Sequence, residues 1–282
     1  MLGSVTDGEH AGPVQAFVSG NGELLGWRRG EQLSLAPRHL MDTLYALHVN
    51  LMLDEVGAWF LGLVALAWIL DHIAAAVLAV PRVARWREAF TVQGRRGSLR
   101  RLFDLHRAPG LWSLPFTLVL AVSGFCLSWH EESRAIVGVV SPVSHRLHED
   151  FSVVEPARKI PLSTALYNAQ LNGAGRIDSV LILERNGAYG VRSFDARDID
   201  PYGRLWTYIA MDDGRLLGQR HDNGESAGDA FFAWQYPLHS GKAFGLPGRL
   251  AIFGAGLATL TLCITGVRLW WRRRWQQLQA PA

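Results

Sequence analysis

The chain has 282 residues, of which 49% are hydrophobic and only 19% are charged, and its mean hydropathy is +0.09. This composition is typical of a membrane protein with a sizeable aqueous part. The net charge of +3 comes mostly from arginine clusters, which we interpret as determinants of membrane topology, so we expect no nucleic-acid partner. The two cysteines, Cys126 and Cys263, lie in apolar segments without a CxxC or CxxCH motif, which excludes a disulfide framework and covalent haem attachment.

Residues 1–45 are predicted to be the C-terminal part of a first extracytoplasmic domain. Residues 14–27 (VQAFVSGNGELLGW) have the pattern of two strands joined by a glycine turn. The region contains no apolar h-region of the kind that a secretory signal peptide requires. If this region lies outside the cytoplasm, its export needs another explanation. The internal repeat supplies one.

Three apolar segments are each close to the roughly 20 residues that cross the hydrocarbon core of a bilayer. They cover residues 56–80, 109–129 and 246–270. With their flanks, we assign the first span and its lead-in to 46–80, the second span to 108–130 and the third to 241–272. The sequence therefore predicts an integral membrane α-helical protein with three spans.

The arginine clusters set the expected topology. Residues 81–107 form a short loop with eight arginines, and Arg272, Arg273 and Arg274 follow the third span. Short arginine-rich segments stay cytoplasmic. We therefore expect this loop and the tail, 273–282, to be cytoplasmic, and residues 1–50 and 131–240 to lie outside.

Residues 131–240 are expected to form a small α+β domain. Residues 162–171 (LSTALYNAQL) have the pattern of a short amphipathic helix with Ser163 or Thr164 as its N-cap. Strand patterns follow, with turns at Asn186-Gly187 and Asp213-Gly214, and cover residues 177–183, 188–194 and 205–211. This order suits one antiparallel sheet packed by one face on one helix.

An internal repeat is the most informative feature. Residues 14–80 and 205–272 share one plan: strand, glycine turn, strand, a Leu-His step and a long apolar helix that ends in arginine. The two histidines are His48 and His239. Each stands 25 or 26 residues after its turn glycine and 33 or 34 residues before the closing arginine. Because each helix is long enough to span a bilayer, the repeat places the two histidines at equivalent depths and suggests a shared ligand.

The two copies differ in what precedes them. The second copy follows an outward-running helix, 109–129, and a soluble domain, whereas the first copy follows neither. We therefore expect the chain to be a fragment or to have a late start, with a complete version holding four spans and roughly 100 more residues at its N-terminus.

Several phrases together carry a family resemblance: FDLHRAPGLWSLPF at 103–116, AVSG at 121–124 and PLHSGKAFGLPGR at 237–249. With the strand pair around Asp213-Gly214, they resemble the PepSY-associated transmembrane family. The resemblance implies a bacterial inner (cytoplasmic) membrane protein, often iron-regulated, whose extracytoplasmic PepSY-like domain is periplasmic. Some members are ferric-siderophore reductases with haem b. The missing first helix, with the histidine of its own Leu-His-Arg step, is a departure from the family.

His48 and His239 are candidate axial ligands of one haem. Bis-histidine ligation needs two neutral imidazoles from facing helices, one on each side of the iron. Two pseudo-equivalent helices related by an axis along the membrane normal would present such a pair. The alternative is that both histidines bind backbone groups or lipid headgroups at the ends of their helices.

Three further histidines are candidates for haem ligation. His106 lies just before the second span, and its symmetry mate would belong to the missing helix, which would leave an inner haem site incomplete. His72 lies beside Asp71 in the first span, and ionisable groups inside a membrane are usually functional. The intervals from His48 to His72 and from His106 to His130 are both 24 residues. In antiparallel helices this spacing sets His72 beside His106, and His130 beside His48 as a rival partner.

The leading hypothesis is a redox protein with one or two non-covalent haem b groups. Electrons would pass from a quinone or cytoplasmic reductase to iron in a ferric siderophore or another iron complex. Such a protein would be an oxidoreductase, with membrane lipid around its spans. One alternative is a non-enzymatic PepSY-domain module that binds or regulates a peptidase. Another is an accessory subunit of an iron importer. No GxSxG, HExxH, Walker or dinucleotide-binding motif supports hydrolase or nucleotide chemistry.

Overall fold

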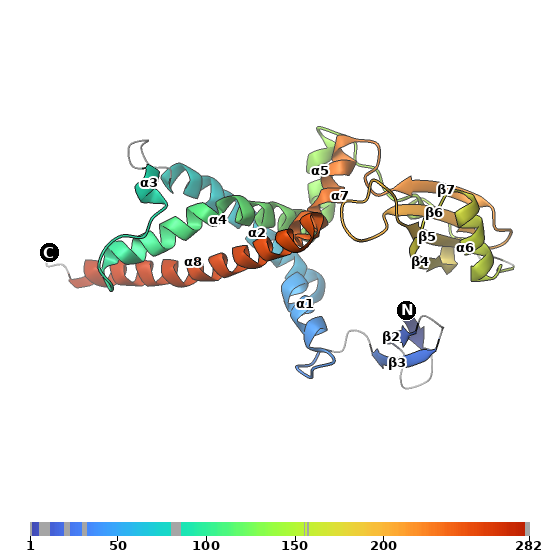
Figure 1. The fold of residues 1–282 in the computed structure, drawn as a ribbon, viewed down its shortest axis with the longest axis horizontal. Helices are drawn as coiled ribbons and strands as arrows, with labels where there is room; N and C mark the ends of the chain where they lie inside the picture. Colours follow the sequence, from blue (N-terminus) through green and yellow to red (C-terminus); the bar gives the residue numbers. More distant parts are fainter. Residues whose placement is uncertain are drawn as a thin grey trace. The chain divides into compact units, whose positions relative to one another are not determined.

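The chain forms two compact units, Met1–Leu63 and Val64–Ala282, whose boundary lies within one long helix (Figure 1). The computed structural model describes residues 2–5, 12–19, 23–29, 33–79, 86–154, 156 and 158–279. The turn glycine Gly22 and two of the loop arginines, Arg82 and Arg85, lie outside the described residues.

The first unit contains an antiparallel sheet in the order β1-β2-β3, a short helix and the start of a long helix. Their bounds are β1 Leu2–Val5, β2 Gly12–Val18, β3 Leu24–Arg29, α1 Leu40–Asn50 and α2 Asp54–Ala79. The strand–turn–strand prediction for residues 14–27 is thus confirmed in its two strands. The lead-in and first span are not one continuous helix. The break between α1 and α2 holds Leu51, Met52 and Asp54 at positive φ, a conformation that non-glycine residues rarely adopt.

Three helices within the described residues are long and apolar enough to cross a membrane. They cover Asp54–Leu78, Leu99–Ser128 and Lys242–Gln279, the last taking in the 3₁₀ turn η5 Lys242–Phe244 and α8 Gly245–Gln279. The prediction of three spans is confirmed. The second helix, α4 Leu99–Ser128, begins well before Pro109, because the Ser98 side chain caps it by accepting from the Arg101 amide. His106 therefore lies inside α4, and only part of the predicted loop, 81–107, is non-helical; within it lies the short helix α3 Trp86–Ala89.

Small residues let the helices of the second unit approach one another. A Cβ on Gly110 of α4 would stand 3.3 Å from the Leu262 side chain of α8, and a Cβ on Gly266 of α8 would stand 3.2 Å from the His106 ring, so only glycine fits comfortably at either position. Gly124 of α4 faces His239, the last residue of α7 Ala227–His239. Both α7 and α8 thus pack on α4, which is the central helix of this unit.

The α+β domain has the predicted elements. Its sheet is an antiparallel meander of β4 Ile177–Leu183, β5 Ala188–Ser193, β6 Leu205–Ala210 and β7 Leu216–His221. The helix α6 Leu162–Leu171 matches its prediction at both ends. The predicted N-cap is wrong, since Pro161 precedes the helix and no side chain caps it. The remaining short elements of the unit are α5 His130–Gly138, η3 Leu147–Glu149 and η4 Glu184–Asn186.

Both faces of the central strands are covered, whereas the sequence predicted one covered face. On one face, α6 contributes Ala165 and Ala169 to a core that also contains Val191, Ile209 and Met211. On the other face, the segment 146–151 covers two stacked rings, Trp206 and Tyr208, whose planes are 6° apart. Every residue of β6 is therefore buried, and the sheet is a firm base for the side chains at its edge.

Candidate functional site

His72 lies on the C-terminal half of α2 and is 7% exposed. Its Nδ1 lies 2.8 Å from the Trp68 carbonyl oxygen, and its Nε2 lies 2.8 Å from the Thr117 hydroxyl of α4. A carbonyl oxygen only accepts, so Nδ1 carries the proton and donates to Trp68. Nε2 is engaged by the Thr117 hydroxyl, which also lies 3.1 Å from the Ser113 carbonyl oxygen. Both ring nitrogens of His72 therefore have protein partners, so a metal could bind Nε2 only in place of Thr117.

His106 of α4 is held in the same tautomer by α8. Its Nδ1 lies 3.0 Å from the Thr265 hydroxyl oxygen. That hydroxyl donates its only proton to the Thr261 carbonyl at 2.7 Å, so the imidazole is the donor in the contact with Thr265. The lone pair of His106 is therefore on Nε2. Gly266 follows Thr265 and leaves room for the ring, because a Cβ there would stand 3.2 Å from Cε1 of His106.

His239 makes the equivalent contact with α4. Its Nδ1 lies 2.8 Å from the Ser123 hydroxyl oxygen, which donates to the Val119 carbonyl at 2.6 Å. The imidazole again donates from Nδ1, which leaves the lone pair on Nε2. Gly124 follows Ser123 and faces the ring, because a Cβ there would stand 3.6 Å from Cε1 of His239. A hydroxyl residue followed by glycine thus holds both His106 and His239.

The three imidazoles meet α4 at three levels. His106 belongs to α4 itself, His72 contacts Thr117 of α4, and His239 contacts Ser123 of α4. At 1.5 Å per residue, the first two levels are separated by about 16 Å along the helix, and the last two by about 9 Å. The expectation that His72 lies beside His106 is therefore wrong. The 24-residue spacing assumed straight helices that start at one depth, and α2 instead meets α4 near its middle.

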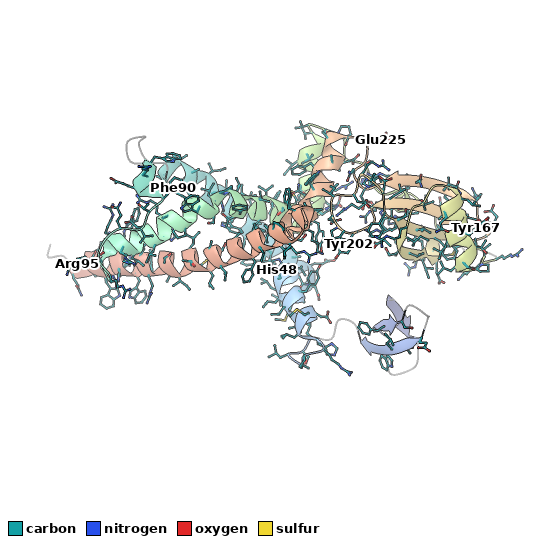
Figure 2. The ribbon with its side chains drawn as sticks, in the orientation of Figure 1. His48, Phe90, Arg95, Tyr167, Tyr202 and Glu225 are labelled. Carbon is teal, nitrogen blue, oxygen red and sulfur yellow. The ribbon has the colours of Figure 1, made fainter. Side chains whose placement is uncertain are left out.

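The two other candidates lie at helix ends. His48 is in the last turn of α1 in the first unit, as Figure 2 shows. His130 opens α5 after a break at Trp129, so the interval from His106 to His130 is not one straight helix as predicted. The His130 ring packs edge-on against Phe232 of α7, with centroids 5.8 Å apart. It also lines a polar cavity.

This polar cavity has a volume of about 240 Å³ and lies where α5, α7 and the sheet meet. That is room for on the order of eight water molecules. Its charged lining consists of four arginines and three carboxylates: Arg134, Arg146, Arg204, Arg220, Glu149, Asp222 and Asp229. The sequence reasoning missed this cluster, because its members come from five separate segments.

Most of the cavity's charges are paired. Arg146 binds Asp222 through two contacts of 3.1 Å, and its guanidinium also covers the Trp206 ring. Burial lowers the pKa of the neighbouring His148 imidazole, as does the positive charge of Arg146. Within the described chain, Arg134 has no carboxylate partner; it donates to the Ser144 carbonyl at 3.1 Å. A cationic group thus faces the cavity.

Asp229 fixes one wall of the cavity. Its carboxylate accepts from the Ser144 amide at 2.7 Å and from the Ser144 hydroxyl, and its side chain is 5% exposed. Burial alone would raise the pKa of Asp229, but these hydrogen bonds, with those from Ser226 and the Glu225 amide, lower it below the ordinary value. The charged form of Asp229 therefore ties the segment after α5 to the start of α7.

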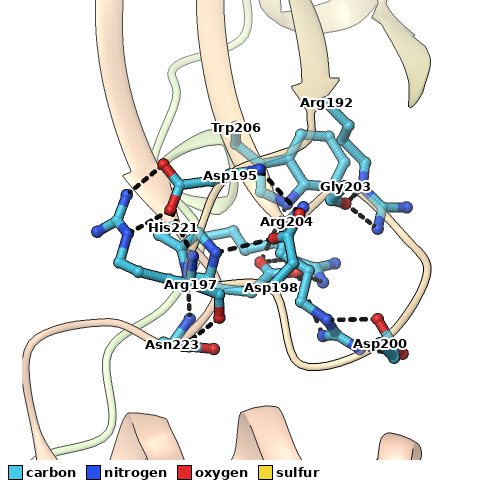
Figure 3. A network of polar contacts seen from close by, with 12 residues as sticks. Arg192, Asp195, Arg197, Asp198, Asp200, Gly203, Arg204, Trp206, His221 and Asn223 are labelled. Carbon is cyan, nitrogen blue, oxygen red and sulfur yellow. Dashed lines mark hydrogen bonds and ion pairs between the residues drawn. The ribbon is translucent and has the colours of Figure 1, made fainter. Parts of the chain in front are cut away.

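The floor of the cavity rests on a second polar network (Figure 3). Arg204 binds Asp200 through contacts of 3.0 and 2.7 Å, and the His221 imidazole lies 3.1 Å from Asp198. Arg197 makes a 2.7 Å ion pair with Asp195 and lowers the pKa of that carboxyl to about 2. These contacts hold the loop between β5 and β6 against β7.

Comparison with known proteins gives the family. The PepSY-associated TM region matches residues 4–273, nearly the whole chain. The chain belongs to this family. It is also 24% identical over 265 residues to uncharacterized protein PA4219 of Pseudomonas aeruginosa. That match covers 83% of the chain and 64% of the relative, so the chain spans about two thirds of the relative's length.

Proposed function

We propose that the protein binds haem and passes electrons across the bacterial inner membrane, with the α+β domain in the periplasm. The observation that carries this proposal is the shared tautomer of His106 and His239. Each donates from Nδ1 to a hydroxyl of a neighbouring helix, which puts the lone pair on Nε2, the nitrogen that would hold the iron. Metal-binding histidines almost always fix their other nitrogen in this way.

His106 and His239 are imidazoles of the kind that would hold a b-type haem. Haem b would supply a one-electron couple inside a low-dielectric bundle. His239 and His48 remain the proposed pair on one iron, because the repeat gives both the same place in the last turn of a short helix. His72 and His106 lie at different levels of α4, so each is proposed to serve a separate iron.

The periplasmic partner is proposed to be iron in a ferric siderophore or another iron complex, and the electron donor to be a quinol or a cytoplasmic reductase. The polar cavity supports the first part, because Arg134 of α5, which has no carboxylate partner among the described residues, brings a cation to its lining. Its 240 Å³ would take one anionic group of a chelate rather than the whole chelate. Reduction of the iron would weaken its hold on hard oxygen ligands.

A reduced-minus-oxidised absorption spectrum of the purified full chain tests the proposal. We expect a Soret band and split α bands in the wild type, and their partial loss in His239→Ala and His48→Ala. If these two share one iron, the double variant loses no more haem than either single variant. His145→Ala is the matched control, because His145 is exposed and bonded to Glu149. Absence of haem from the wild type, or equal loss in the control, would falsify the proposal.

A second candidate function is a binding module without redox chemistry. The same polar cavity favours it, since a site for an anionic group needs no haem to bind a partner. This function predicts that wild-type protein lacks a Soret band and that Arg134→Gln still abolishes partner binding. The spectrum therefore separates the two candidates.

A further inference from the structure

The N-terminal end of α4 and the C-terminal part of α8 form a pocket of about 340 Å³. Its charged lining is entirely cationic and consists of Arg96, Arg101, Arg268 and Arg272. The rest of the lining is Gly97, Ser98, Leu102 and Leu105. The arginines come from two helices and from the segment before α4, so the pocket is built by tertiary packing rather than by one stretch of sequence.

These four charges are not neutralised within the described chain. No ion pair there includes any of the four, whereas the neighbouring Arg100 and Arg107 both bind Asp104. Asp104 is 0% exposed and holds those two arginines on another face of α4. Arg272 donates to the Gly97 carbonyl at 2.8 Å, which ties α8 to the start of α4 without reducing the charge. Four arginines held together in this way favour an anion.

The start of α4 adds to the positive potential. Ser98 caps only the Arg101 amide, and a helix of 30 residues carries a partial positive charge at its N-terminus. Backbone N–H groups at helix N-termini bind phosphate in many proteins. The pocket therefore brings the arginine guanidinium groups and a helix N-terminus together around one small volume.

The surroundings of the pocket are apolar. Leu102 and Leu105 line it, and a second cavity that shares Gly97 and Arg272 with it is lined by Leu99, Trp271 and Trp275. Both tryptophans are more than half exposed, as in the aromatic belts at membrane interfaces. A free anion would use only the arginines, whereas a lipid would use both the cationic pocket and this apolar wall.

We propose that this pocket binds the phosphate group of an anionic phospholipid from the surrounding leaflet. The phosphate would lie among the four arginines and the acyl chains along the tryptophan-lined cavity. Basic pockets between transmembrane helices bind such headgroups in other proteins. The site is independent of haem, so it stands or falls separately from the redox function.

Native mass spectrometry of the delipidated full chain tests the site, with phosphatidylglycerol and phosphatidylcholine of identical acyl chains as probes. Arg101→Gln/Arg268→Gln removes one charge from each helix of the pocket. Arg273→Gln/Arg274→Gln is the matched control, since it removes two charges just beyond the pocket. At about 1 kcal/mol per arginine, the pocket variant should bind phosphatidylglycerol roughly 10- to 30-fold more weakly.

Support requires a clear preference of the wild type for phosphatidylglycerol and a selective loss in the pocket variant. Equal weakening in both double variants would mean general attraction by arginines and overturns the site. So does equal binding of the zwitterionic lipid. Inorganic phosphate that competes as well as the lipid would show a site for free anions and contradict the lipid assignment. The single variants Arg101→Gln and Arg268→Gln should each give part of the loss, which separates a binding effect from misfolding of the double variant.

Discussion

The hairpin of the first unit and the last hairpin of the α+β domain are built in the same register. In β2–β3, Phe17 pairs with Gly26 and Val18 with Leu24, with an irregularity between the two pairs. In β6–β7, Tyr208 pairs with Gly218 and Ile209 with Leu216, with the irregularity at the same place. The repeat seen in the sequence is thus a repeat of backbone pairing, including its bulge.

The similarity continues into the helices. Each hairpin leads to a short helix with histidine in its last turn, and then to a break and a long apolar helix. The difference lies in burial. Tyr208 is 0% exposed under the segment 146–151, whereas Phe17, its counterpart, is 49% exposed. One backbone plan therefore serves a packed domain in one copy and a thin sheet in the other, which suggests that the histidine position, rather than the core, is what the two copies share.

The largest expected effect concerns that difference in burial. Tyr208→Ala should destabilise the α+β domain by about 4 kcal/mol, because it empties a fully buried ring site and breaks the 2.7 Å contact with His148. Phe17→Ala should cost less than about 1 kcal/mol in the first unit, because half of the ring is already in water. Amide hydrogen exchange of β6 and β2 in the full chain measures both. Equal effects would mean that the two hairpins are equally packed.

The second prediction concerns the glycine near the start of each long helix, Gly57 and Gly248. Each lies close to the carbonyl group of the residue seven positions earlier in the chain. A Cβ at Gly57 would overlap the Asn50 carbonyl, and a Cβ at Gly248 would overlap that of Gly241. Either glycine changed to alanine should destabilise the break before its long helix by about 2–3 kcal/mol.

Gly254→Ala is the control for this effect, because nothing lies within 4 Å of a Cβ there. It should stabilise α8 by about 0.5–1 kcal/mol, as is usual for glycine replaced in a helix. Thermal unfolding in detergent gives the order of the variants. If Gly248→Ala behaved like Gly254→Ala, the close approach of α8 to the preceding break would be disproved.

The third prediction concerns a carboxylate that anchors the second copy. Asp229 lies ten residues before His239, and at the same distance before His48 the chain has Arg38. Asp229→Asn should cost about 2 kcal/mol, since the charged hydrogen bonds to Ser144 become neutral ones.

The pH dependence of this contribution has a definite sign. Because folding lowers the pKa of Asp229 below its ordinary value near 3.8, its contribution is present above that value and is lost as the pH falls through the lower, folded pKa. The difference in stability between wild type and Asp229→Asn should therefore shrink on acidification. A constant difference down to strongly acidic pH would contradict the account.

The sequence predicted the elements that depend on local pattern. Apolar runs marked the three spans, and alternation with turn glycines marked β4, β5 and β6 within one residue at each end. It did not predict that α1 and α7 are separate short helices. In the second copy Gly241 and Gly245 permit the break, but in the first the break uses Leu51 and Asp54 at positive φ, and no residue type there signals it.

The candidate site was predicted in its residue types and missed in its geometry. Sequence spacing singled out the candidate histidines. The level of each histidine along α4 depends on where the helices cross, so the spacing did not place His72 against Thr117. The supporting hydroxyls were also missed. Ser123-Gly124 and Thr265-Gly266 have the pattern of small residues for helix packing, and only tertiary structure shows that each holds an imidazole across the interface.

The smallest expected effect tests those hydroxyls and the equivalence of His239 and His106. Ser123→Ala and Thr265→Ala each remove the acceptor of an Nδ1–H, so each should weaken haem retention about tenfold while leaving the ligand in place. Thr117→Val removes a hydroxyl from Nε2 of His72 instead, and that nitrogen is the proposed ligand. It should therefore leave haem retention unchanged or improve it. The rate of haem transfer to an excess of apomyoglobin, followed by absorption, measures haem retention in all three variants. Weaker retention in Thr117→Val than in Ser123→Ala would mean that the assigned tautomers are reversed.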